Sequence, residues 1–469
     1  MTIDFRAEVD KRKDALMDDL INLLRINSER DDSQADAEHP FGPGPVKALE
    51  FFLEMAERDG YETKNVDNYA GHFTFGQGEE ELGIFGHLDV VPAGSGWDTD
   101  PYEPVIKDNR LYARGSSDDK GPTMACYYAL KIIKELGLPT SKKVRFVVGT
   151  DEESGWGDMD YYFEHVGLPK PDFGFSPDAE FPIINGEKGN ITEYLHFSGE
   201  NKGAVRLHSF SGGLRENMVP ESATARFTSH LDQTTLGASL ADFAGKHNLK
   251  TELSVEDGQY IATVYGKSAH GSIPQEGVNG ATYLALYLSQ FDFEGPARAF
   301  LDVTANIIHE DFSGEKLGVA YEDDCMGSLS MNAGVFQFDE TNDDNTIALN
   351  FRYPQGTDAK TIQTKLEKLN GVEKVTLSDH EHTPHYVPMD DELVSTLLAV
   401  YEKQTGLKGH EQVIGGGTFG RLLERRGVAY GAMFPGDENT MHQANEYMPL
   451  ENIFRSAAIY AEAIYELIK

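Results

Sequence analysis

The sequence predicts an α/β domain that is interrupted by an inserted α+β domain. Before residue 187, continuous apolar runs alternate with amphipathic helical stretches, which is typical of a buried sheet between helices. From 187 to 382 the strand-like segments alternate apolar and polar residues, as strands with one solvated face do. The helical pattern of the first part then returns. We therefore predict one domain from residues 1–186 and 383–469, and an inserted domain from residues 187–382.

The first domain begins with two amphipathic helical stretches. Residues 11–26 place leucines on one face, and a second stretch begins at Pro45 and stops at Gly60. Short apolar runs follow, and a helical stretch separates the first two of them. We predict buried strands at residues 82–87, 144–148 and 173–176, a helix at residues 122–135, and further helices at 387–406 and 453–467.

The inserted domain contains a faint internal echo. An asparagine, a short apolar stretch and a strand that ends near an arginine occur twice, at residues 217–226 and again at residues 345–352. A helical stretch follows each strand, at residues 236–243 and 358–369. Chance explains this echo as simply as a duplicated half-insert does, so both interpretations stay open.

The charge of the chain excludes several classes of partner. Its 469 residues include 78 Asp and Glu against 41 Lys and Arg, which gives a net charge of −37. Such a protein repels phosphate backbones and anionic lipids, so we expect no nucleic-acid and no membrane partner. Most of the surplus is solvated surface, and only a handful of carboxylates can hold cations. Two cysteines provide neither a disulfide framework nor a cysteine zinc cluster.

The location expected from the sequence is the cytoplasm. The first 30 residues lack the basic and apolar regions of a signal peptide. The chain also has no run of about 18 apolar residues, which a membrane-spanning helix needs.

Polar residues follow each apolar run of the first domain, where the sheet of an α/β fold carries its chemistry. Singly, each group fits a solvated loop, a surface histidine or an acidic helix start. Together they offer imidazole and carboxylate ligands for Zn²⁺, Mn²⁺ or Co²⁺, and one of two adjacent glutamates is free to move protons. These residues are His87, Asp89, Asp118, Asp119, Glu152, Glu153 and Asp178.

Eight motifs resemble those of the M20 family of dinuclear metallopeptidases. They span residues 87–446 in the order and spacing of the family, and the inserted domain lies at the same point of the chain. Within the family the chain is most similar to a bacterial dipeptidase whose lid domain is doubled within one chain. The motifs are H-L-D-V-V-P, R-G-S-S-D-D-K-G, G-T-D-E-E-S-G, S-P-D-A-E, G-K-S-A-H-G-S-I-P, N-F-R-Y-P, G-G-G-T and M-H-Q-A-N-E.

The resemblance implies a zinc-peptidase-like mixed sheet flanked by helices, with the insert as a lid, and two Zn²⁺ ions for which Mn²⁺ or Co²⁺ can substitute. It implies His87 and Asp178 as ligands of one metal, Glu153 and His442 as ligands of the other, and Asp118 as the bridge. It further implies Glu152 as general acid/base for a metal-bridged water, with Asp89 orienting His87. The lid and the second half of the first domain would supply His270 for the oxyanion and Asn217, Arg352, Gly417 and Thr418 for the substrate.

The substrate expected from the resemblance is a short dipeptide with a free amine. Relatives that cut such substrates usually carry Asp at the position of Asp178, whereas N-acyl hydrolases tend to carry Glu. The alternatives are an N-acyl-amino-acid or succinyl-diaminopimelate type deacylase, or a metal-binding protein without catalysis. In many relatives the lid dimerises and a neighbour's histidine enters the site. A doubled lid can supply that histidine within one chain, so we expect a monomer.

Two other groups resemble functional sites by composition only. The histidine-rich segment 379–385 lies at a predicted domain crossing marked by Pro384, so we interpret His380 and His382 as solvated linker residues and leave the role of His385 open. Cys126, in a helical stretch beside two tyrosines, is expected to be buried filler.

Overall fold

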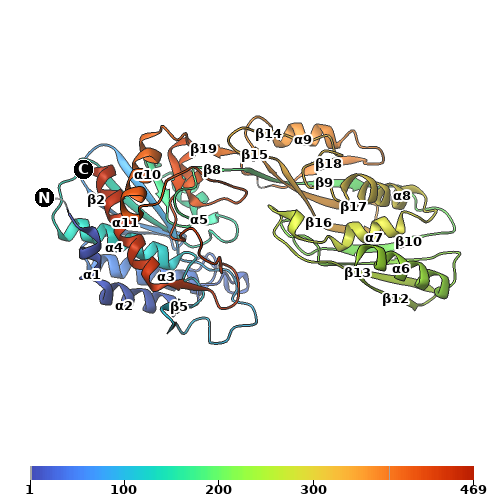
Figure 1. The fold of residues 1–469 in the computed structure, drawn as a ribbon, viewed down its shortest axis with the longest axis horizontal. Coiled ribbons are helices and arrows are strands. Elements are labelled where there is room, and N and C mark those ends of the chain that lie inside the picture. Colours follow the sequence, from blue (N-terminus) through green and yellow to red (C-terminus); the bar gives the residue numbers. More distant parts are fainter. Residues whose placement is uncertain (1–2, 380) are drawn as a thin grey trace. The chain divides into compact units, whose positions relative to one another are not determined.

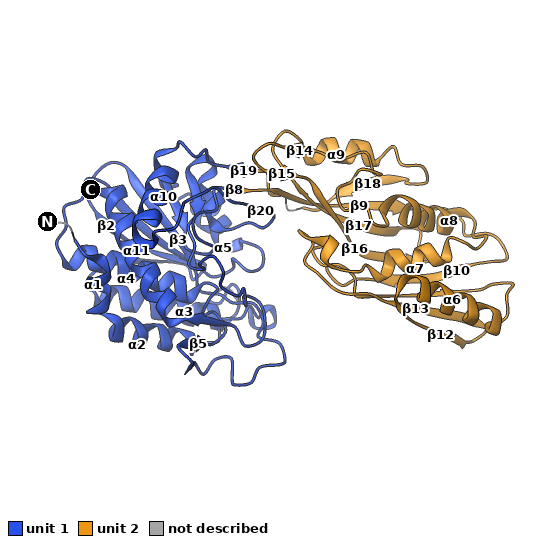
Figure 2. Cartoon of the chain, in the orientation of Figure 1, with its two compact units in different colours: residues 1–186, 385–469 blue, residues 187–384 orange. Residues whose placement is uncertain are grey.

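The computed structural model describes residues 3–379 and 381–469. The chain forms two compact units (Figure 2): unit 1 contains residues 1–186 and 385–469, and unit 2 contains residues 187–384. Each unit is described by itself. Within the described ranges, no helix combines the length and the apolar character that crossing a membrane requires.

Unit 1 is built on a six-stranded mixed sheet (Figure 1) with the order β1-β2-β6-β3-β7-β21. Four neighbouring strands run parallel, from β6 to β21, while β1 and β2 are antiparallel at one edge. The predicted α/β fold with a mixed sheet is therefore confirmed. The strands are β1 Glu62–Val66, β2 Ala70–Gly76, β3 Glu81–His87, β6 Lys143–Gly149, β7 Phe173–Ser176 and β21 Gly427–Ala429.

Helices cover both faces of this sheet, because its central strands are apolar on both sides. The larger core lies on the face covered by α1 Phe5–Asp10, α2 Lys13–Leu24, α3 Pro43–Arg58, α4 Lys120–Glu135, α10 Glu392–Thr405 and α11 Leu450–Ile468. A smaller core with Phe85 and Val147 lies on the other face, under α5 Gly157–Asp160 and the helical turns η2 Tyr161–His165 and η5 Phe419–Arg426. A single turn, η1 Asp32–Gln34, precedes α3.

Two small ladders fix the loops of unit 1. β22 Tyr447–Pro449 pairs with β5 Arg110–Tyr112, which pairs with β4 Val105–Lys107. The second ladder has the order β19-β8-β20, and its strands are β19 His385–Tyr386, β8 Gly186–Glu187 and β20 Val413–Ile414. The first ladder holds the loop before β22 beside the loop after β5.

Unit 2 is an eight-stranded antiparallel sheet with the order β12-β13-β11-β10-β16-β17-β9-β18. One face packs on a core of apolar residues beneath α6 Gln233–His247, α7 Gly280–Leu288, α8 Gly295–Asp302 and α9 Ala359–Leu366. The turns η3 Pro274–Glu276 and η4 Val303–Ile308 and the hairpin of β14 Glu322–Asp323 and β15 Gly327–Ser328 complete it. The strands are β9 Gly189–Phe197, β10 Leu207–Gly212, β11 Ser222–Phe227, β12 Lys250–Glu256, β13 Gln259–Tyr265, β16 Ser330–Asp339, β17 Asn345–Tyr353 and β18 Lys374–Leu377.

The strand order of unit 2 is that of two similar halves joined side by side. Outward from the centre, one half reads β10-β11-β13-β12 and the other reads β16-β17-β9-β18. The two innermost strands, β10 and β16, pair antiparallel, as equivalent strands related by a two-fold axis would. Helix α6 connects β11 to β12, and α9 connects β17 to β18. The two echo segments lead into β11 and β17, which hold equivalent places, so the topology fits the duplicated half-insert.

A buried carboxylate lies within the second half of this sheet. Glu193 on β9 is fully buried, and among the residues that the structure describes neither of its carboxylate oxygens has a hydrogen-bond partner. It follows Ile191 and precedes Leu195 on the face that packs under the helices. Burial, together with the negative charges of Glu367 and Glu381, raises the pKa of the Glu193 carboxyl to about 8.

We predict that Glu193→Gln stabilises the protein relative to the wild type increasingly as the pH rises above about 4.5. The pKa of this carboxyl rises from 4.5 to about 8 on folding, so the folded chain keeps a proton that the unfolded chain loses. Stability of the wild type therefore falls as pH rises from about 4.5 to 8, and the amide removes this dependence. Urea unfolding at pH 5 and pH 9 should show the variant gaining about 1–4 kcal/mol more at the higher pH. An equal difference at both values would contradict this explanation.

Candidate functional site

The carboxyl ends of three parallel strands bring the predicted site residues of unit 1 to one edge of the sheet. His87 is the last residue of β3, and it is paired in register with Gly149, the last residue of β6. Glu152 and Glu153 follow β6 in a turn, and Asp178 follows β7. Parallel neighbours end at the same edge, so residues about 90 positions apart in the chain become neighbours in space.

Asp118 lies between two imidazoles. Its Oδ1 is 3.1 Å from Nε2 of His87, and its Oδ2 is 2.9 Å from Nε2 of His442. His442 in turn lies 3.1 Å from Oε2 of Glu153, and His87 lies 3.7 Å from Oδ2 of Asp178. The five predicted metal ligands therefore form one continuous group with Asp118 at its centre.

Two sets of three residues could each surround a metal ion. The ligand atoms of His87, Asp118 and Glu153 lie within 4.8 Å of one another, and so do those of His87, Glu152 and Asp178. The second set includes Glu152, which was predicted to move protons rather than to bind metal. The carboxylate of Glu152 therefore lies beside Asp178, next to the five predicted metal ligands.

Asp89 holds two parts of the site together. Its Oδ1 lies 3.4 Å from Nδ1 of His87, and its backbone oxygen lies 3.0 Å from the same nitrogen. Its two carboxylate oxygens also accept the backbone N–H groups of Glu152 and Glu153, at 3.2 and 3.1 Å. The residue predicted to orient His87 thus contacts that imidazole and also fixes the turn of the two glutamates.

Asp119 follows Asp118 in the loop before α4 and is fully buried. The peptide bond between Asp118 and Asp119 is cis. Oδ2 of Asp119 accepts the backbone N–H of His87 at 3.1 Å and the hydroxyl of Thr123 at 2.6 Å. Asp119 therefore ties the start of α4 to the end of β3.

Glu446 was not among the predicted site residues, although it stands in the same motif as His442. It is fully buried, and its carboxylate accepts the guanidinium of Arg114 at 2.7 Å. It also accepts the backbone N–H groups of Gly115, Ser117 and Asp118, at 3.1, 2.8 and 3.1 Å. Glu446 thus connects the loop that carries His442 to the loop that carries Asp118. Glu446 and Arg114 each stand in one of the eight motifs, but nothing in the sequence indicated that they pair.

The pKa values record how tightly these charges are packed. Burial raises the pKa of Glu152, and the negative charges of Asp178, Glu153 and Asp118 raise it further. Burial and Asp118 raise the pKa of Glu153 to about 7 in the same way. Burial lowers the pKa of His442, but its contacts with Asp118 and Glu153 outweigh this and raise it to about 11.

This donor set fits divalent cations. Carboxylate oxygens and imidazole nitrogens are the ligands of Zn²⁺ and of related divalent ions. Burial and the neighbouring negative charges raise the pKa of both Glu152 and Asp178, and a bound cation would favour their charged forms.

The predicted lid residues lie in unit 2. Asn217 and His270 occupy two exposed segments that pair with each other: Gly271 donates its N–H to the backbone oxygen of Asn217 at 2.7 Å. Arg352 is buried on β17, where its Nε donates to Oδ1 of Asn350 at 3.2 Å.

The remaining predicted residues have local roles in unit 1. Thr418 caps η5 by accepting the N–H of Gly420 at 3.1 Å, and Gly417 directly precedes it. His385 is buried, and its Nε2 lies 2.6 Å from the backbone oxygen of Gly427. Cys126 is buried in α4, as expected.

The histidine-rich segment differs from the linker that we expected. His382 in unit 2 is half-buried, and its backbone pairs with Asn190. A backbone that extends the sheet edge in this way is part of the fold rather than a solvated linker. His380 lies outside the described residues.

The comparisons with known proteins cover nearly the whole chain. A sequence profile described as peptidase family M20/M25/M40 matches residues 83–466. Beta-Ala-Xaa dipeptidase of Lactobacillus delbrueckii subsp. lactis is 45% identical over 472 residues, with 100% of this chain and 99% of that protein covered.

Solved structures share the fold at low sequence identity. Human carnosine dipeptidase 1 superposes with a TM-score of 0.56 at 15% identity, with 99% of both chains covered. The M20 family metallo-carboxypeptidase Sso-CP2 of Sulfolobus solfataricus gives a TM-score of 0.58 at 17% identity, with 96% of this chain and 98% of that chain covered. The profile match and the 45% identical relative, together with a group of candidate metal ligands at the strand ends, show that this chain is a peptidase and belongs to peptidase family M20/M25/M40.

Proposed function

We propose that the protein is a dinuclear zinc dipeptidase that hydrolyses short dipeptides with a free amino group. The observation that carries this proposal is the position of Asp118, whose two carboxylate oxygens each face a different imidazole. A carboxylate with one oxygen toward His87 and the other toward His442 can bridge two cations, and this is the arrangement that a two-metal site requires.

The ligands divide around that bridge. His87 and Asp178 would hold one Zn²⁺, Glu153 and His442 the other, and Mn²⁺ or Co²⁺ could take their places. Two such cations, when bound, lower the pKa of a shared water toward neutrality and polarise the carbonyl of the substrate.

Glu152 is the residue that we assign to proton transfer. It lies beside Asp178 and His87, and its backbone N–H is fixed by Asp89. At a carboxylate oxygen it accepts the proton of the attacking water and then passes that proton to the leaving amine.

Residues of unit 2 would bind the rest of the substrate. Nδ1 of His270 lies 2.7 Å from the hydroxyl oxygen of Ser272 and 3.3 Å from its backbone nitrogen, so the turn itself orients the ring. We assign His270 to the oxyanion that forms as the carbonyl is attacked. Arg352 suits the C-terminal carboxylate because its guanidinium is planar and always charged, and Asn217 would donate beside it.

The dipeptide substrate class rests on Asp178 and on the relatives. The Lactobacillus protein is named for dipeptides that begin with β-alanine, so we include these among the substrates. Thr418 and Gly417 would line the substrate pocket near the carboxylate. We propose the cytoplasm as the location.

We also propose that the protein acts as a monomer. The antiparallel pairing of β10 with β16 joins two similar halves within one chain, where relatives would join two chains. Sedimentation should therefore give a mass near 51.9 kDa, and a mass near twice that value would contradict a monomer.

A peptide panel tests the proposed function directly. With the Zn²⁺-loaded protein we expect rapid hydrolysis of Ala-Ala and β-Ala-His, and little or no hydrolysis of N-acetyl-Ala-Ala or of an alanine pentapeptide, all followed by amino-acid release. Faster turnover of the N-acetylated form would identify a deacylase instead. Equal rates on the pentapeptide would contradict the dipeptidase assignment.

Glu152→Gln should separate proton transfer from metal binding. The amide keeps the shape of the side chain but cannot accept a proton, so we expect kcat to fall about 10²–10⁴-fold. Metal content, measured by elemental analysis after dialysis, should stay at two ions per chain. A chelator should abolish wild-type activity. Adding Zn²⁺ should then restore the activity of the wild type but should not raise that of the variant. Full activity of the variant, or wild-type activity in excess chelator, would refute the mechanism.

A further inference from the structure

We propose that Asn332 and Asn350, which face each other on β16 and β17, are positioning residues for the substrate carboxylate. Asn332 holds the turn that carries Asn217, and Asn350 holds the guanidinium of Arg352. The inference rests on the proposed function, because it takes Asn217 and Arg352 as the residues that bind this carboxylate.

The side chain of Asn332 binds the two residues on either side of Asn217. It is 1% exposed, and its Nδ2 donates to the backbone oxygens of Glu216 at 2.7 Å and of Met218 at 3.0 Å. These two carbonyls belong to the residues immediately before and after Asn217. One buried amide therefore sets the direction of the Asn217 backbone.

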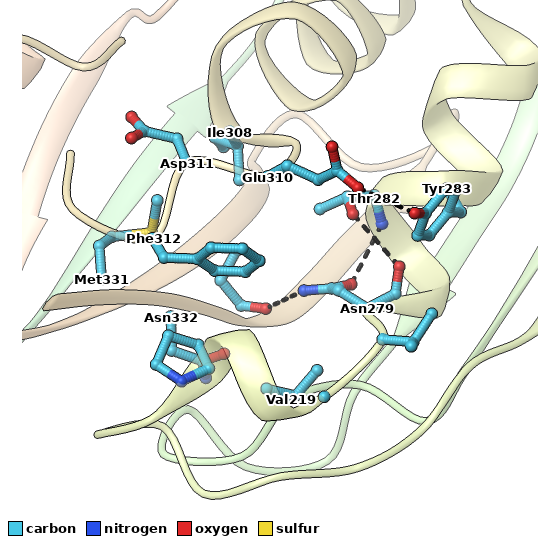
Figure 3. Close-up of a pocket in the computed structure, with 14 residues that line it drawn as sticks. Val219, Asn279, Thr282, Tyr283, Ile308, Glu310, Asp311, Phe312, Met331 and Asn332 are labelled. Carbon is cyan, nitrogen blue, oxygen red and sulfur yellow. Dashed lines mark hydrogen bonds between the residues drawn. The ribbon is translucent and has the colours of Figure 1, made fainter. Parts of the chain in front are cut away.

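A cavity of about 60 Å³ borders Asn332 and Val219, the residue that follows this turn. Figure 3 shows the cavity with Asn332, Met331 and Val219 in its wall. Across the cavity, Asn279 is held by its own hydrogen bond to the backbone oxygen of Ala333 at 2.8 Å. The cavity borders Asn332 rather than the turn itself, so the two hydrogen bonds to Glu216 and Met218 are the contacts that carry the positioning role.

The same turn is coupled to His270. The backbone of Met218 pairs with that of His270, and Val219 donates its N–H to the backbone oxygen of Ala269 at 2.9 Å. A displacement of residues 216–218 would therefore move His270 as well as Asn217.

Asn350 positions Arg352 in a similar way, and both residues lie on β17. It is 3% exposed, and its Oδ1 accepts Nε of Arg352 at 3.2 Å. Its Nδ2 donates to Oδ1 of Asn190 at 2.9 Å and to the hydroxyl of Thr192 at 3.0 Å, both on β9. The NH₂ group of the Asn350 side chain is thus held by β9, and its carbonyl oxygen orients the guanidinium of Arg352.

A role in positioning can be separated from a role in stability by the choice of substrate. Ala-Ala carries the C-terminal carboxylate, and alanyl-alaninamide lacks it. A variant that is merely less stable loses activity on both substrates by the same factor. A variant with misplaced Asn217 or Arg352 loses more activity on Ala-Ala than on the amide, so the ratio of the two kcat/KM values falls.

The first test is Asn332→Asp, which keeps the shape and removes both hydrogen-bond donations. We expect KM for Ala-Ala to rise roughly 10–100-fold, as a displacement of about 1 Å can produce, and the Ala-Ala to amide ratio to fall by a similar factor. The matched control is Gln337→Glu, the same amide-to-acid change at an exposed position of β16, which should leave the ratio unchanged.

Two further variants keep the test decisive if Asn332→Asp does not fold. Asn332→Ala leaves room for water to reach the two carbonyls, and Asn350→Ala removes the acceptor of Arg352. Each should lower the Ala-Ala to amide ratio at least 10-fold. In a double-mutant cycle, Asn332→Ala should lower the ratio little further once Asn217→Ala is present, because the first acts through the second.

The outcomes distinguish this inference from the proposed function. If Asn217→Ala and Arg352→Met leave the ratio unchanged, the carboxylate assignment fails, and this inference fails with it. If those two variants lower the ratio and neither Asn332→Ala nor Asn350→Ala does, only the positioning role is wrong. Additive effects in the cycle would also overturn it.

Discussion

The buried carboxylate of Asp118 is the constraint on which the rest of the site depends. Burial disfavours the charged form, yet contacts with His442 and His87 outweigh burial and lower its pKa well below the usual range. An ion in a low-dielectric interior is tolerated only when its partners are held in place. The strand end that supplies His87 and the loop that supplies His442 must therefore both converge on one oxygen pair.

Glu446 shows how the fold meets that demand. It puts a second carboxylate near the first, and burial and the charge of Asp118 raise its pKa. Three backbone N–H groups and the guanidinium of Arg114 surround it, so the negative charge is shared by fixed donors. Because Glu446 and His442 share one loop, the same contacts that neutralise Glu446 also place the second imidazole over Asp118. The group of candidate ligands is thus preorganised by Glu446 and Arg114, which lie outside it.

The sequence predicted the strands of unit 1 well, because continuous apolar runs have a direct physical meaning, and the polar residues that follow these runs lie together in the structure. β3, β6 and β7 lie within one residue of the predicted ranges. The helix predicted at 11–26 is shorter, Lys13–Leu24, because a separate helix with Asp4 as its cap ends at Asp10. Asn332 could not be predicted, since a polar residue on an alternating strand normally faces water. Its role comes from two carbonyls more than 100 residues away, which no local pattern encodes.

The two halves of unit 2 are alike in topology but unlike in the residues they present. The first half carries Asn217 and His270 on its connecting segments, and the second half carries Arg352 on a strand. Asn332 belongs to the second half, yet the carbonyls it binds belong to the first. Asn332 and Asn350 are paired on neighbouring strands, so a shift between β16 and β17 would disturb both predicted carboxylate contacts at once. A duplicated sheet joined at β10 and β16 can therefore act as one binding surface, because the amides on one half fix the turn of the other.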